Sequence, residues 1–118
     1  MIAAIGLALA LALSPAPTSA NVVVGDIGSR AFIVKAFGLD RMADDRQVLR
    51  GWLCRRAPGA PIRRLVITAE DRAGNAIWKD FVTTPTFAPG RAKECRLMRI
   101  DAPPGIASQV TLWRLTRP

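Results

Sequence analysis

The 118-residue chain contains no histidine and no tyrosine, and it has only two cysteines. Without histidine the usual general base near neutral pH is missing, so neither a Ser-His-Asp nor a Cys-His arrangement can be assembled. After residue 20 the only serines are Ser29 and Ser108, and neither lies in a Gly-x-Ser-x-Gly turn. A zinc site would need an unusual ligand set. We therefore expect no catalytic residue, no metal and no cofactor.

Acidic residues are few as well, nine against seventeen basic ones. Paired carboxylates are the remaining route to hydrolysis, and Asp44-Asp45 and Glu70-Asp71 are the only adjacent pairs. Arginine flanks both pairs, and a neighbouring positive charge favours the ionised carboxylate over the protonated form that a general acid needs. Surface ion pairing explains these residues better, and the sequence predicts a protein that is not an enzyme.

The first twenty residues carry no charged side chain. An apolar run at 2–13 is followed by a proline break at 14–17 and by the small-residue triplet 18–20, which is the layout of a secretory signal peptide. The usual Lys or Arg before the apolar run is missing. A retained anchor is the alternative, but twelve residues span roughly 18 Å as a helix against a hydrocarbon layer of roughly 30 Å. We expect cleavage after Ala20 and a periplasmic or secreted protein that begins at Asn21.

Export changes how the two cysteines are interpreted. Disulfides persist in oxidising compartments, so Cys54 and Cys95 are expected to form one; two buried reduced thiols are the alternative. The bond would close a loop of about 42 residues, which the chain-entropy model values at roughly 4 kcal/mol.

From Asn21 to Pro118 the sequence predicts one small domain built from strands. Short segments of alternating or β-branched residues are separated by turns rich in Gly, Pro, Asp and Asn, with no convincing helix. The expected strands cover 21–24, 30–37, 47–55, 62–69, 76–82, 92–100 and 109–115, and 38–46 is expected to be a loop. The pattern predicts an antiparallel β-sandwich of about seven strands, clearest over 47–115.

The formal net charge of +8 lies entirely after residue 20, and fourteen of the seventeen basic residues are arginine. Arginine binds phosphate or carboxylate through its planar fork, although a genome rich in G and C also raises arginine content. Arg55 and Arg56 begin a loop that Arg63 and Arg64 end. If this loop folds back as a hairpin, four guanidinium groups gather at one end as a candidate anion-binding edge. The alternative is a set of solvated arginines that protect an edge strand from aggregation.

Trp52, Trp78 and Trp113 lie in expected strands. Tryptophans in alternating strands usually pack in the core or cover a sheet edge, whereas a carbohydrate site needs exposed aromatic residues with amide and carboxylate neighbours. Few amides are available here, so core packing is favoured.

Several segments resemble FxLYD-type domains, which are small extracytoplasmic immunoglobulin-like sandwiches of bacteria. The resemblance rests on the residues of 48–53, 61–62, 65–74 and 89–90 and covers 47–115. At the motif that names the family, 67–71 keeps only the final aspartate. The resemblance implies an immunoglobulin-like sandwich in an extracytoplasmic compartment, with no catalytic residue to carry over.

Two functions follow as expectations. The first is an exported, non-catalytic module that contacts another protein of the cell envelope, with an exposed unpaired strand such as Asn21–Val24 adding to a partner's sheet. The alternative is a basic module that binds an anionic polymer or lipid surface, such as lipopolysaccharide, nucleic acid or acidic membrane. No small-molecule substrate is evident.

Overall fold

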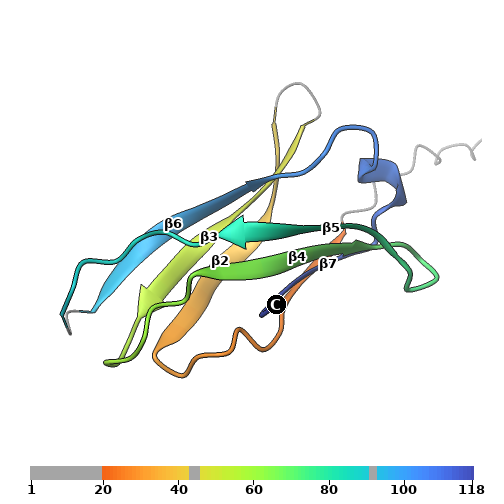
Figure 1. Cartoon of the computed structure of the whole chain (residues 1–118). Coiled ribbons are helices and arrows are strands. Elements are labelled where there is room, and N and C mark those ends of the chain that lie inside the picture. The colour runs from red at the N-terminus through yellow and green to blue at the C-terminus, as the bar shows by residue number, and fades with distance from the viewer. Residues whose placement is uncertain (1–19, 43–45, 91–92) are drawn as a thin grey trace, which may run out of the picture.

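The computed structural model describes residues 20–42, 46–90 and 93–118. Residues 1–19 of the expected leader and the acid pair Asp44-Asp45 lie outside the described residues. Within the described part, seven strands form two facing sheets, which confirms the expected small β-sandwich (Figure 1). The strands are β1 (Asn21–Val24), β2 (Phe32–Arg41), β3 (Gln47–Arg55), β4 (Arg64–Glu70), β5 (Ala76–Thr83), β6 (Glu94–Asp101) and β7 (Leu112–Thr116), with a short 3-10 helix at Ala107–Gln109 before β7.

One sheet has four strands in the order β1-β7-β4-β5, and the other has three in the order β2-β3-β6. All neighbouring pairs are antiparallel except β1 and β7, which run parallel with Asn21 opposite Leu112. Two expectations are corrected here. The sandwich is not wholly antiparallel, and Asn21–Val24 is not an unpaired strand, because β7 hydrogen-bonds to it along its length.

The core lies between the sheets and follows from the alternation of the central strands. In β3, Leu49 and Leu53 point inward and are fully buried, whereas Arg50 and Trp52 point outward. In β4 the inward residues Leu65, Ile67 and Ala69 are fully buried by the same rule. The strand period of two predicted from the sequence therefore separates core from surface in these two strands. The largest fully buried side chains are Trp113, Phe32, Leu49, Leu53, Leu65, Ile67, Leu115 and Val48.

The expected loop at 38–46 is wrong in its first part, because β2 continues through Arg41. One extra residue is inserted between Lys35 and Gly38, so the strand passes a β-bulge and then resumes pairing with β3. The inserted segment includes Ala36, which has a φ of 53°. Gly38 is a local signal for the end of a strand, which is why the sequence predicts a loop here. The strand continues because it pairs with β3 beyond the bulge.

The bulge turns Phe37 toward Gly51 on the neighbouring strand. A Cβ built on Gly51 would lie 2.8 Å from both the Cα and a ring carbon of Phe37, closer than real Cβ atoms approach. We expect Gly51→Ala to lower the free energy of unfolding by about 1–3 kcal/mol, because the backbone of β2 must shift. Chemical denaturation measures this loss, and Gly38→Ala, where the added Cβ meets nothing within 4 Å, is the control. Equal losses in both variants would contradict the Phe37 contact.

The β4–β5 hairpin forms where the sequence placed it. The carboxylate of Asp71 accepts hydrogen bonds from the amides of Ala73 (3.0 Å) and Asn75 (2.9 Å), and Gly74 takes a positive φ of 84°. An Asp side chain that satisfies the turn amides and a glycine in the left-handed region are the local features that fix this turn.

Cys54 and Cys95 form a disulfide, as expected. They lie directly opposite each other on β3 and β6, with Cα atoms 4.0 Å apart. The bond therefore staples two strands of one sheet, whereas the conserved disulfide of antibody domains joins the two sheets.

No helix in the described ranges 20–42, 46–90 and 93–118 is long and apolar enough to cross a lipid bilayer.

Candidate functional site

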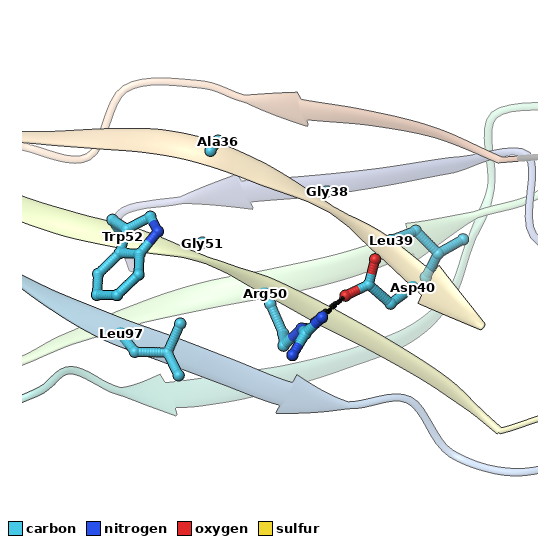
Figure 2. A pocket seen from close by; sticks show the side chains of 8 residues that line it. All are labelled: Ala36, Gly38, Leu39, Asp40, Arg50, Gly51, Trp52 and Leu97. Carbon is cyan, nitrogen blue, oxygen red and sulfur yellow. Dashed lines mark hydrogen bonds and ion pairs between the residues drawn. The ribbon is translucent and has the colours of Figure 1, made fainter. Parts of the chain in front are cut away.

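The β-bulge in β2 leaves a hollow on the outer face of the three-stranded sheet. At the bulge this strand presents the small residues Ala36 and Gly38 to the hollow, and neither has a side chain large enough to fill the space next to β3. The hollow has a volume of about 430 Å³. It is lined by Ala36, Gly38, Leu39, Asp40, Arg50, Gly51, Trp52 and Leu97 (Figure 2).

One wall of the hollow is apolar and exposed. Trp52 on β3 and Leu97 on β6 are directly opposite in the strand register and lie side by side in Figure 2. Trp52 is 45% exposed and Leu97 is 51% exposed, although both are large hydrophobic residues. The apolar surface of these two side chains is in contact with water. Burial against a partner would remove that unfavourable contact.

The opposite wall is an ion pair. The guanidinium of Arg50 reaches back from β3 to Asp40 on β2, with its Nε donating to the carboxylate at 2.6 Å, and the two side chains are about half exposed (Figure 2). Arg99 stands directly across from Arg50 on β6 and is paired with Asp101 at 3.3 Å. Each of the two facing arginines thus has its own aspartate, which offsets the repulsion between them.

This arrangement suits contact with another protein more than chemistry. An exposed tryptophan beside a leucine and an arginine, around a hollow that accepts a side chain, is the composition found at the centres of protein interfaces. Arg50 and Arg99 are each paired with an aspartate, and Lys35, directly opposite Trp52 on β2, adds a further positive charge, so the excess positive charge of this face is small. The Arg50–Asp40 pair provides donors and acceptors next to the apolar wall, which is how such surfaces specify orientation.

The structure places the four predicted anion-binding arginines in different surroundings. The segment 56–63 does not close a hairpin, because β3 belongs to one sheet and β4 to the other. Arg55 points into the sandwich, where its side chain is 6% exposed and donates to the carbonyl of Ala88 at 2.9 Å. It also pairs with Glu94 at 3.4 Å and lies over the ring of Phe87 at 5.6 Å. Arg55 therefore anchors the segment before β6 instead of facing solvent.

The other three predicted arginines are exposed, but each contacts a different part of the protein. The Nε of Arg56 donates to the carbonyl of Arg30 at 3.0 Å. Arg63 lines a small hollow with residues 83–87, and Arg64 lies over the ring of Phe81 at 4.0 Å. Arg64 alone of the four lines the larger hollow at this end of the sandwich.

The three tryptophans divide between core and surface. Trp113 is fully buried and meets the half-buried Trp78 edge to face, with ring centroids 5.9 Å apart, so core packing is confirmed for this pair. The expectation is wrong for Trp52, which lies on the outer face of β3. It alternates with the inward-pointing Leu53, so the strand period carries it to the solvent side.

Sequence reasoning missed Asp40, Arg50 and Leu97 as members of one site. Asp40 falls in the segment 38–46 that the sequence predicts as a loop, and the opposition of Trp52 and Leu97 depends on strand register. A usable signal was present in the alternation of β3, which puts Trp52 on the same face as Arg50 and thus on the exposed side. No family model matches the chain, and neither a curated protein nor a solved structure matches it.

Proposed function

We propose that this chain is an extracytoplasmic, non-catalytic module that binds a partner protein of the cell envelope through the outer face of the β2-β3-β6 sheet. The observation that carries the proposal is the exposed pair Trp52 and Leu97 beside the Arg50–Asp40 ion pair. We call this surface, together with the hollow of about 430 Å³, the Trp52 face.

Energetics favour a macromolecular partner for this face. Tryptophan and arginine supply most of the binding free energy at protein interfaces when they become desolvated, and both are held here on a rigid sheet. The disulfide between Cys54 and Cys95 lies next to the Trp52–Leu97 pair in the register of β3 and β6 and holds the two strands together. A surface that is already ordered loses little conformational entropy when it binds.

The disulfide also supports an extracytoplasmic location for the protein. Cross-links of this kind persist outside the reducing cytosol, which agrees with export and removal of a leader after Ala20. The absence of histidine from the entire sequence supports a role without acid-base catalysis.

Photo-crosslinking tests the Trp52 face directly. A benzoylphenylalanine placed at position 97 of the full chain, expressed in its own host, is expected to form one discrete adduct with an envelope protein that mass spectrometry identifies. Trp52→Ala should weaken binding of that identified partner by about thirtyfold, the effect of removing an interface anchor worth about 2 kcal/mol.

Phe81→Ala is the matched control, because Phe81 is also an exposed aromatic residue, at 54%, but belongs to the four-stranded sheet. It should leave the adduct and the affinity unchanged. An adduct that survives Trp52→Ala, or that is lost equally in both variants, would contradict the proposed face.

A further inference from the structure

A second hollow lies at the end of the sandwich where β1, β3 and β7 finish. It has a volume of about 650 Å³ and is bounded by the segment 27–31, the segment 58–62 and the C-terminal residues 117–118. Arg30, Arg64 and Arg117 line it. None of the described residues in its lining is acidic, and none is aromatic. We call these three residues the arginine triad.

The fold holds Arg117 in place. Its backbone amide donates to the carbonyl of Asp26 at 2.8 Å, which ties the end of β7 to the loop after β1. Gly28 has a φ of 80°, and a Cβ there would lie 3.2 Å from the Cδ of Arg117. The loop therefore packs against the aliphatic part of Arg117, whose Nε lies 3.4 Å from the carboxylate of Asp26.

The loops that carry the rest of the triad are fixed to each other. The amide of Arg56 donates to the carbonyl of Ala31 at 2.8 Å, and the Arg56 side chain donates to the carbonyl of Arg30. A Cβ on Gly59 would lie 2.5 Å from the Cβ of Ala31, which shows how closely the two loops approach. Arg64 is steadied by its position over the ring of Phe81. The hollow is therefore formed before any ligand arrives, which lowers the entropic cost of binding.

The charge around this hollow is unbalanced. Asp26 pairs with Arg117 at 3.4 Å, and both side chains are more than 60% exposed, so solvent screens this ion pair. Among the side chains, this one aspartate stands against the three arginines of the triad. The contrast with the Trp52 face, where aspartates match the arginines, points to a different kind of ligand.

We infer that the arginine triad binds a phosphate-type oxyanion group, either free or as part of a phosphorylated headgroup. Guanidinium forks hold phosphate through paired, charge-assisted hydrogen bonds. Three arginines line this one hollow, and their combined charge matches a group that carries more than one negative charge. A single-stranded nucleic acid would favour aromatic residues on which bases stack, and the described lining has none. This inference concerns a site separate from the Trp52 face and does not depend on it.

Inorganic pyrophosphate is the first probe, and the amide resonances of Gly28, Ser29 and Gly59 report its binding by NMR. We expect these amides to shift on titration and the affinity to fall as salt rises, because the interaction is between charges. Arg30→Gln combined with Arg64→Gln should weaken binding at least about tenfold. Asp26→Asn keeps the side-chain oxygen that accepts from Gly28 and should tighten binding, by up to about fivefold.

The matched control combines Arg72→Gln with Arg99→Gln, which changes the net charge equally at residues that do not line the hollow. Equal weakening in the control and the triad variants would mean a nonspecific charge effect and would overturn the inference. So would the absence of shifts at Gly28, Ser29 and Gly59.

A second arm uses phosphatidylcholine vesicles with and without phosphatidylglycerol. Binding of both pyrophosphate and anionic vesicles, each weakened by the triad variant, supports a phosphorylated headgroup as the source. Binding of pyrophosphate alone supports a free phosphate compound. Binding of vesicles alone would indicate attraction by the total charge and would overturn the site.

Discussion

Replacing both Cys54 and Cys95 by alanine is expected to lower the free energy of unfolding by about 4 kcal/mol. The disulfide joins residues 41 positions apart, so its removal restores the conformational freedom of a long loop in the unfolded chain. Small domains have only about 5–15 kcal/mol of stability in total, so the variant should be close to unfolding at 37 °C. Urea denaturation of the double variant and the oxidised protein measures the difference.

Reduction of the unaltered protein provides the control. The reduced chain should show nearly the same loss, because Cys54 and Cys95 lie on the outer face of the β2-β3-β6 sheet and alanine there opens no large cavity in the core. Intact mass should be two hydrogens lower in the oxidised form, and thiol reagents should not label it. Stoichiometric labelling of the native protein without reductant would refute the prediction.

Trp113→Ala is expected to cost about 3–5 kcal/mol of stability, the range for removing a buried aromatic side chain. Trp113 is fully buried on β7 between two pairing partners, β1 and β4, and its ring meets that of Trp78 edge to face. Its removal leaves a cavity that the surrounding sheet residues cannot fill by small movements. Thermal and urea denaturation of the purified variant measure the loss.

Trp52→Ala is the matched control, because it removes the same side chain from an exposed position. We expect it to change stability by less than about 1 kcal/mol while it weakens partner binding by about thirtyfold. Trp113→Phe should cost less than Trp113→Ala, since the buried Nε1 of Trp113 has no hydrogen-bond partner among the described residues and phenylalanine removes that group. A large loss of stability in Trp52→Ala would mean that the face is structural.

The two proposed surfaces differ in physical character although both contain arginine. On the Trp52 face, Arg50 and Arg99 are each paired with an aspartate, so the apolar contact of Trp52 and Leu97 dominates. At the arginine triad, three arginines line the hollow and one exposed aspartate pairs with Arg117. The +8 charge of the chain therefore becomes informative only when its distribution is known.

Local features of the sequence were sufficient for much of the fold. Alternation in 47–55 predicted a strand there, although it did not say which face is buried, and the Asp71–Asn75 segment carried its own turn chemistry. Pairing of the two cysteines followed from their number and from the expected compartment, and the structure confirms it. The strand and turn predictions succeeded because each depends on neighbours within a few residues. The disulfide prediction succeeded because two cysteines allow only one pairing.

Tertiary structure alone decided the two proposed surfaces. The bulge in β2 forms because pairing with β3 outweighs a local signal for a turn, and it creates the hollow beside Trp52. Strand register sets Leu97 across from Trp52 and Glu94 across from Arg55. Composition and periodicity determine which residues form strands and core. Contacts between residues far apart in the chain have no local signature, so only packing determines which side chains meet.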